Sequence, residues 1–164
     1  MKVTFAPRGI LQIDEARIVY RNFSGEESQF NRKGDRNFSL VIPDEELAQK
    51  LAEEGWNVKI RPAREEGEDP FIHLPVKVKF NDRGPNVYLI TNGQRNKLDE
   101  ETVGLLDSVD IVNVDLDIRP YDWEMNGKTG RTAYLQAIMV TQEVNRFEAR
   151  FAEEEFPGND EMPF

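Results

Sequence analysis

The dipeptide Asn126-Gly127 constrains the fold more than any other short stretch of the chain. It lies between two long segments, residues 109–123 and 131–144, in which apolar and polar residues alternate. Asn-Gly suits a type I′ turn because both residues tolerate positive φ, and a period of two is typical of strands with one buried face. The sequence therefore predicts a long β-hairpin. The residues expected to face inward on its first strand are Val112, Val114, Leu116 and Ile118.

Shorter strand and helix patterns precede this hairpin. Asp44 precedes two acids and is expected to cap a helix in which Leu47 and Leu51 face inward and which ends at Gly55. A second short helix is expected from Leu98 to about Leu106. The expected strands, each rich in β-branched or alternating apolar residues, fall within 10–23, 36–42, 57–61 with Ile60 inward, 71–80 and 87–91.

Most of these strands are expected to pair antiparallel, with one helix between the early and the later strands. This pattern is best accommodated by a mainly β fold, an oligonucleotide-binding (OB-like) antiparallel barrel with one or two short helices and a long C-terminal hairpin. We expect one domain over residues 1–146 and a flexible acidic tail over residues 147–164. Architecture of this kind does not by itself fix function.

Composition bears on the cellular compartment of the protein and on the kinds of site that it can form. The chain has no Cys, which excludes disulfides and thiolate metal sites. Residues 1–13 lack the basic-then-apolar pattern of a signal peptide, and the apolar stretches are far shorter than a membrane span. We therefore expect a cytoplasmic protein with no membrane partner, no metal and no cofactor.

Two predicted strands carry cations on their outward sets. The outward set of 57–61 holds Lys59 and Arg61, and that of 71–80 holds Lys77 and Lys79 together with His73. Like charges on neighbouring strands destabilise a sheet unless an anion offsets them. The anion is either phosphate or a nearby carboxylate, and the sequence does not choose between the two.

The stretch from Phe23 to Phe38 interleaves aromatic and basic residues. This combination is typical of single-strand binders, in which cations follow the backbone and aromatic rings accept stacked bases. Phe38 and Phe23 are expected to enter the core through their strands, whereas Phe30 lies in a polar loop and is the better stacking candidate. The cations of this region are Arg21, Arg32, Lys33 and Arg36.

The terminal hairpin repeats this combination. Tyr121 and Trp123 fall on the outward set of the first strand, where they either stack on bases or cover a hydrophobic edge or a subunit interface. Trp56, directly after Gly55, is expected to pack in the core. The basic residues of the hairpin are Arg119, Lys128 and Arg131.

Catalytic patterns are weak. Asp115, Asp117, Asp122 and Glu124 invite comparison with a two-metal nuclease, because such sites need clustered oxygen ligands. Acids on an exposed strand face are far commoner, and no Walker loop, Gly-x-Ser-x-Gly or zinc spacing is present. We predict that the chain is not an enzyme.

The segment Glu153–Phe164 holds five acids and no Lys or Arg. Such a run is expected to stay extended and solvated, and Pro163 lowers the ordering cost when a partner captures it. Phe164 offers an aromatic ring and a carboxylate to an apolar pocket beside a cation. A purely solubilising tail has no use for this ring. The predicted docking tip is Asp160, Glu161, Met162, Pro163 and Phe164.

This tip resembles the acidic tip of bacterial-type single-stranded DNA-binding proteins, which end in several acids followed by Ile-Pro-Phe. Met162 replaces Ile, and the final acidic run is one residue shorter. The rest of the chain is more similar to phage-encoded single-stranded DNA-binding proteins. The stretches that carry this second resemblance are Ala16–Phe23, Gly34–Phe38 and Val112-Asn-Val-Asp-Leu.

The resemblance implies binding of single-stranded DNA during phage replication or recombination, recruitment of partner enzymes through the tip, and assembly as dimers or larger oligomers in a bacterial host. The net charge of −10 opposes this hypothesis, and removal of the five tail acids leaves half of that excess on residues 1–152. Phosphate binding depends on where cations cluster and not on their sum. The alternative is an acidic protein that mimics DNA or binds a host factor without touching nucleic acid.

Overall fold

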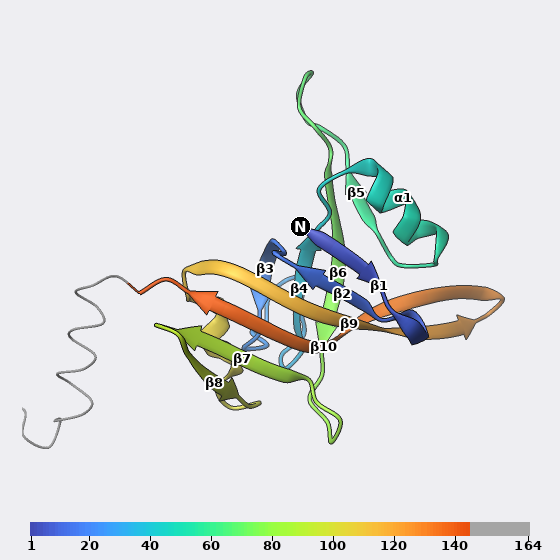
Figure 1. The fold of residues 1–164 in the computed structure, drawn as a ribbon. Coiled ribbons are helices and arrows are strands. Elements are labelled where there is room, and N and C mark those ends of the chain that lie inside the picture. Colours follow the sequence, from blue (N-terminus) through green and yellow to red (C-terminus); the bar gives the residue numbers. More distant parts are fainter. Residues whose placement is uncertain (145–164) are drawn as a thin grey trace, which may run out of the picture.

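The computed structural model of the protein describes residues 1–144, which form one ten-stranded sheet with a single α-helix (Figure 1). The strands are β1 (Lys2–Phe5), β2 (Leu11–Asp14), β3 (Ile18–Asn22), β4 (Arg36–Val41), β5 (Lys59–Arg61), β6 (Phe71–Val78), β7 (Asn86–Thr91), β8 (Gln94–Leu98), β9 (Ile111–Met125) and β10 (Lys128–Gln142). The helices are α1 (Glu45–Glu53) and the 3-10 helices η1 (Pro7–Gly9) and η2 (Val103–Asp107). No described helix is long and apolar enough to cross a membrane.

The β9–β10 hairpin confirms the prediction made from Asn126-Gly127. Both turn residues have positive φ, 51° and 78°, as a type I′ turn requires. The two strands pair antiparallel from the turn back to the Ile111–Gln142 pair. This hairpin is the centre of the sheet, because β2 pairs with β9 while β6 and β7 pair with β10.

One prediction about strand arrangement was wrong, that of a closed barrel. Most strand pairs are antiparallel as expected, although β10 runs parallel to β6 and to β7. The turn at Asn126-Gly127 reverses the chain after β9, so β10 runs opposite to β9 and in the direction of β6 and β7. Among residues 1–144 no ladder joins β1 to β3 at the two ends of the strand order, so the sheet is curled but not closed as a barrel.

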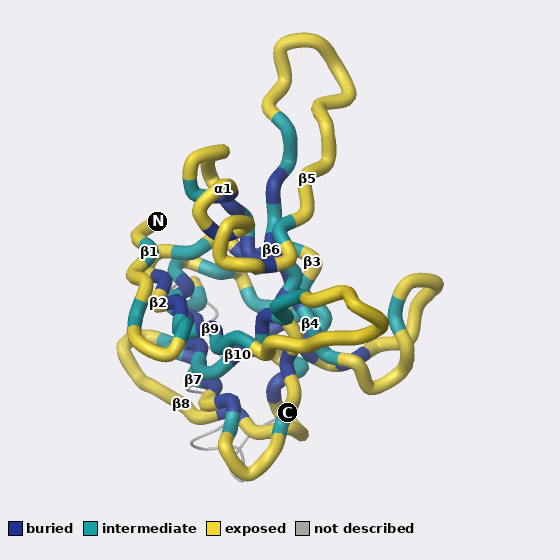
Figure 2. Tube along the Cα trace, turned by 90° about the vertical axis from the view of Figure 1, so that its right-hand side faces the viewer, coloured by how far each residue is buried: buried dark blue, intermediate teal, exposed yellow. Residues whose placement is uncertain are grey.

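The core lies inside the curl, where buried residues gather at the centre of the strands (Figure 2). The Phe23 and Phe38 rings stack there with centroids 5.2 Å apart, and Trp56 is buried as predicted. Helix α1 covers one end of this core. Its cap is the predicted one, since Asp44 accepts a hydrogen bond of 2.7 Å from the Leu47 amide, which would otherwise lack a partner.

Some inward-facing predictions were also wrong. Val112 is 61% exposed because the pairing of β9 with β10 slips between Asn113 and Ile111, which leaves Val112 as an unpaired extra residue. Ile60 is equally exposed, because β5 is a three-residue strand at an edge, and helix α1 covers it incompletely.

The predicted second short helix, from Leu98 to about Leu106, is shorter than expected and is the 3-10 helix η2, and strand β8, which was not predicted, precedes it. Asn92-Gly93 forms a second positive-φ turn, with φ of 51° and 79°, and folds β8 back on β7. The connection between β5 and β6 projects from the body as an arm whose residues 62–69 are exposed (Figures 1 and 2). The predicted tail, residues 147–164, lies outside the described residues.

Candidate nucleic-acid interface

The side of the sheet that faces away from the core carries several of the predicted cations. We call this side of β4, β5, β6 and the β9–β10 hairpin the outer face. Lys59 lies opposite His73, so strand β5 presents its cation on the same side as this residue of β6. Lys77 and Lys79 lie four and six residues after His73, an even spacing that keeps them on the same side, and both are exposed. Arg61 joins them beside Phe71. The sheet thus gathers four cations on one face.

The adjoining part of the hairpin adds aromatic rings beside this row. Tyr134 of β10 lies opposite Lys77 on one side and opposite Arg119 on the other. The Arg119 guanidinium carbon lies 5.0 Å from the centre of the Tyr134 ring, and the Tyr121 ring meets the same ring edge-on at 6.0 Å. Guanidinium groups and aromatic faces arranged in this way contact the phosphates and the bases of a single strand, respectively.

A second aromatic group lies at the β5 end of the outer face. The rings of Phe71 and His73 are 5.1 Å apart, and Tyr20 meets both edge-on at about 6 Å. The Arg61 guanidinium lies 5.1 Å from the Phe71 ring centre. Partial burial lowers the pKa of His73, and the nearby charges of Arg61 and Lys59 lower it further. The part of this pKa shift that comes from Arg61 and Lys59 reflects the positive potential of this region.

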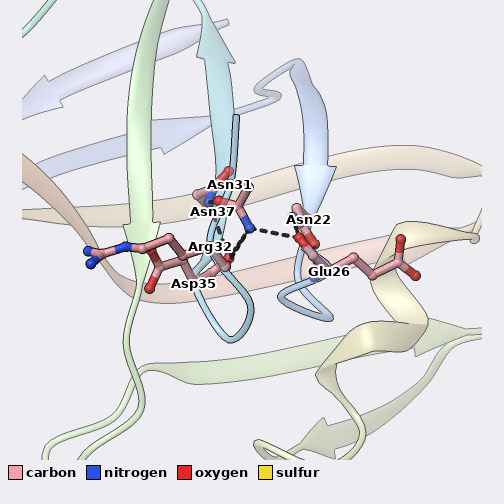
Figure 3. Close-up of polar contacts among 6 residues, drawn as sticks. All are labelled: Asn22, Glu26, Asn31, Arg32, Asp35 and Asn37. Carbon is pink, nitrogen blue, oxygen red and sulfur yellow. Dashed lines mark hydrogen bonds and ion pairs between the residues drawn. The ribbon is translucent and has the colours of Figure 1, made fainter. Parts of the chain in front are cut away.

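The β3–β4 loop is folded around one amide side chain. Asn31 Nδ2 donates to the carbonyl oxygens of Glu26, Asp35 and Arg32 at 2.8, 3.0 and 3.1 Å (Figure 3). Asn31 Oδ1 accepts a further bond of 2.8 Å from Asn37 Nδ2 on strand β4. These contacts tie the loop to itself and to strand β4 beside the outer face, which lowers the ordering cost when a ligand binds there.

A groove of about 570 Å³ runs between this loop and the outer face. Phe30, with 92% of its surface exposed, and Arg32 line its loop side. Lys77, Lys79 and Tyr134 line its floor on β6 and β10. Within residues 1–144 the Arg32 side chain pairs with Asp35 alone, through an exposed contact of 3.5 Å, and such a pair costs little to break. The groove therefore offers cations and an unpacked aromatic ring to an extended anionic chain.

Three predicted binding residues also make contacts within the fold, and one of them, Arg36, lines the groove as well. Arg21 Nη1 donates to the carbonyl oxygens of Leu106 and Val109 at 2.7 and 2.9 Å, which ties β3 to the η2 region. Arg36 Nη2 donates to the Glu100 carbonyl oxygen at 3.1 Å. Side-chain partners of this kind lie far away in sequence, so the pattern of residues did not reveal them.

Arg131 is the third of these residues. It lies on the side of the hairpin opposite the outer face, where its Nε donates to Asp122 Oδ1 at 2.7 Å. Its guanidinium also covers the ring of Trp56. The hydrogen bond lowers the pKa of Asp122. Because Asp122 points to this side while Asp115 and Asp117 occupy the other face of β9, these acids do not form the nuclease-like cluster that was considered.

The remaining predicted residues are Lys33, Lys128, Tyr121 and Trp123, all of which are exposed. Lys33 lies at the tip of the β3–β4 loop and Lys128 at the tip of the hairpin. The docking residues 160–164 lie outside the described part of the chain.

Sequence reasoning missed three aromatic residues of the outer face. Phe71 had a signal, because it alternates in register with Lys77 and Lys79. Tyr134 had none, because its place beside Lys77 depends on the parallel pairing of β10 with β6. Tyr20 departs from strand geometry with φ of 54°, where the pairing of β3 with β4 is interrupted, so a period of two could not place its ring.

Comparison with known proteins places the chain in a family. The family described as "Putative phage ssDNA-binding domain" matches residues 2–162. The chain belongs to this phage family. Membership of a DNA-binding family agrees with the prediction that the chain is not an enzyme. No curated protein matches this phage-type domain in sequence.

Solved structures share the fold of this phage-type domain. One is the single-stranded DNA-binding protein from bacteriophage Enc34 in complex with ssDNA, with a TM-score of 0.58, 11% identity, and coverage of 88% of this chain and 93% of the other. The Enc34 protein in a separate structure gives 0.55 and 13%, with coverage of 90% and 93%. Its C-terminal truncation gives 0.52 and 13%, with coverage of 87% and 91%. At sequence identities of 11% and 13%, this structural similarity establishes the fold alone.

Proposed function

We propose that this chain binds single-stranded DNA with little sequence preference through the outer face and the adjoining groove. The observation that carries the proposal is the row Lys77, Tyr134 and Arg119, which places an aromatic ring between two cations on three neighbouring strands. Phosphates bind the cations, while bases stack on the ring whatever their identity. The protein then protects exposed single strands during phage DNA replication or recombination in the cytoplasm of the bacterial host.

Membership of the phage family supports this proposal, as does the fold shared with a phage protein solved in complex with ssDNA. The groove supports it independently. Its polar and aromatic lining comes from the loop and from two strands, so an extended polymer would contact several elements at once.

A mobility shift with labelled oligo-dT and unlabelled duplex competitor tests the proposal. We expect salt-sensitive binding that the duplex competes for poorly, and we expect the Lys77→Gln variant to bind more weakly because it loses a phosphate contact. Lys50→Gln, on the helix at the opposite side of the sheet, is the matched control. Absence of oligo-dT binding would instead favour an acidic protein that mimics DNA or binds a host factor.

We further propose that the tip Asp160–Phe164 recruits replication or recombination proteins. Its ring and its carboxylates suit an apolar pocket beside a cation. The Phe164→Ala variant should keep its affinity for oligo-dT and lose binding to such a partner in a pull-down with purified replication proteins. Loss of both activities, or of neither, would reject a separate docking role for the tip.

The tail also bears on DNA affinity through its charge. Deletion of Glu153–Phe164 removes five acids that compete electrostatically with phosphate for the same cations. We expect the deletion to raise the affinity for oligo-dT, most visibly at low salt where charges are least screened. Equal affinity of the two forms across salt concentrations would remove this part of the proposal.

A further inference from the structure

The outer face continues beyond the groove onto strands β7 and β8. Strand β7 pairs with the half of β10 that follows its contact with β6, and Met139 of β10 lies opposite Tyr88. Ile138 and Val140 on either side of Met139 are buried, so Met139 points to the solvent side. Tyr88 lies beside Met139 and shares this side. The same side of one continuous sheet therefore carries Tyr134 and, farther along β10, Tyr88.

Strand β8 places two cations around Tyr88. Lys97 lies directly opposite Tyr88, and Arg95 lies opposite Ile90 on the same side. The Arg95 guanidinium carbon is 4.9 Å from the centre of the Tyr88 ring. Both cations are exposed, whereas Tyr88 is half-buried and held in place by its neighbours. This arrangement repeats the pairing of Arg119 with Tyr134 in the groove region.

Three acids border the other side of this path. Asp14, Asp115 and Asp117 line a shallow hollow together with Tyr88 and Met139. Burial raises the pKa of Asp117, and the nearby charge of Asp14 raises it further. Such a row repels phosphate. A strand that leaves Tyr134 along β10 is therefore directed away from β2 and β9 and toward the cations of β8.

We propose that the β7–β8 ribbon, Asn86–Leu98, is a second contact site for the same single-stranded DNA, which runs from Tyr134 past Met139 to Tyr88 and Lys97. The inference rests on the proposed function of the outer face. Tyr134 and Met139 are five residues apart on β10, which corresponds to about 16 Å of strand. The ribbon thus lengthens the stretch of DNA that one protein covers, with one base on the Tyr88 ring and phosphates beside Arg95 and Lys97.

Affinity for oligonucleotides of two lengths tests the ribbon. Oligo-dT of about 6 and about 16 nucleotides lie near the limits of site sizes seen for one OB fold. The full chain should bind the longer oligomer more tightly than the shorter one. DNA is kept in excess over protein, so that each oligomer binds at most one protein. We expect the Lys97→Glu and Tyr88→Leu variants to lose affinity for the longer oligomer by about five- to a hundred-fold, as for a lost stacked base. Their affinity for the shorter one should stay within about two-fold of wild type, because an oligomer of that length in the groove does not reach the ribbon and distant sites contribute independently.

Lys50→Glu is the matched control, because it makes the same change of charge on helix α1, away from the outer face. It should leave both affinities close to wild type. Equal losses of the two ribbon variants on both lengths, or no loss on either, would overturn the ribbon site. Failure of the unaltered chain to bind either oligomer would instead reject the proposed function. Each variant should melt at the temperature of the wild type. A loss of affinity then reflects lost contacts with DNA and not a loss of folded protein.

Discussion

The Trp123 indole packs directly against Gly130, its cross-strand partner in the β9–β10 hairpin. A Cβ atom at residue 130 would lie 2.6 Å from Trp123 Cε2 and 3.0 Å from Nε1, closer than side chains approach one another. Glycine therefore provides the space in which the ring lies. With 40% of its surface exposed, Trp123 is held by the backbone on one side and open to solvent on the other.

The Gly130→Ala substitution should displace this ring. Because Gly130 does not need positive φ, the backbone accepts alanine and the cost falls on Trp123. If the ring stacks on a base, affinity for oligo-dT should fall by up to the ~1–3 kcal/mol of one stacked base. Fluorescence titration measures this, since the other tryptophan, Trp56, is buried. Thr129→Ala is the neighbouring control, and an unchanged affinity of Gly130→Ala would assign Trp123 another role.

Substitutions of Phe30 and Phe38 should affect different properties of the protein, DNA binding and stability respectively. Phe30 is almost fully exposed, so Phe30→Ala should leave the melting temperature unchanged and weaken oligo-dT binding by about 1–3 kcal/mol. Phe38 is buried in the core, so Phe38→Ala should lower the free energy of unfolding by about 3–5 kcal/mol. Chemical denaturation and titration on both variants give the comparison. Full affinity in Phe30→Ala would show that the loop side of the groove does not contact bases.

Asn31→Asp should loosen the β3–β4 loop. The change replaces an amide that donates to three carbonyl oxygens by a carboxylate that repels them. Amide hydrogen exchange in residues 26–35 should speed up, and oligo-dT affinity should fall because the loop must then be ordered on binding. Gln29→Ala, in the same exposed loop, is the control. Unchanged exchange would mean that the loop does not depend on the Asn31 contacts.

His73 should report DNA binding through its pKa. It is the chain's one histidine, so its ring signals can be followed by NMR without overlap. Burial and the charges of Arg61 and Lys59 lower its pKa, and Arg61→Gln should raise it. Phosphates bound near these cations should also raise it, so binding takes up a proton and affinity increases as pH falls through the range of this group. A pKa that does not respond to oligo-dT would place the DNA away from this end of the outer face.

The same shift affects stability. A lowered pKa in the folded state means that the unfolded chain protonates His73 first as pH falls. The contribution of His73 is therefore favourable above its unfolded pKa and is lost as pH falls through the folded value. The His73→Gln variant, which cannot titrate, should show a flatter loss of stability in this range when urea denaturation is measured at several pH values. An identical slope in both proteins would contradict the assignment.

The salt dependence of oligo-dT binding should show how many cations of the protein contact phosphates. Each cation that binds phosphate contributes about 0.7 to the slope of log K against log salt for a single strand. Lys77→Gln and Lys79→Gln should each reduce the slope by roughly this amount. Arg131 is bound to Asp122, so Arg131→Gln should leave the slope unchanged while it lowers stability. A reduced slope for Arg131→Gln would mean that this residue leaves Asp122 to bind DNA.

Local chemistry explains what could be predicted from the sequence. Asn126-Gly127 specifies the hairpin because few residue pairs accept positive φ twice, and Asp44 specifies the start of α1 because its side chain satisfies a free amide. Alternation placed Lys77 and Lys79 on one side of β6, since successive side chains of a strand point to opposite faces. These features depend only on neighbours along the chain.

The sequence by itself therefore determined the hairpin, the helix and the polarity of individual strands. Only the tertiary structure decided which strands lie side by side, and hence that Tyr134 joins Lys77 and that Tyr88 continues the same face. It also decided that Arg21 and Arg131 have hydrogen-bond partners within the fold, because these partners lie on other segments. Strand pairing and partner choice depend on the global minimum of packing and hydrogen bonding, which no local pattern of residues encodes.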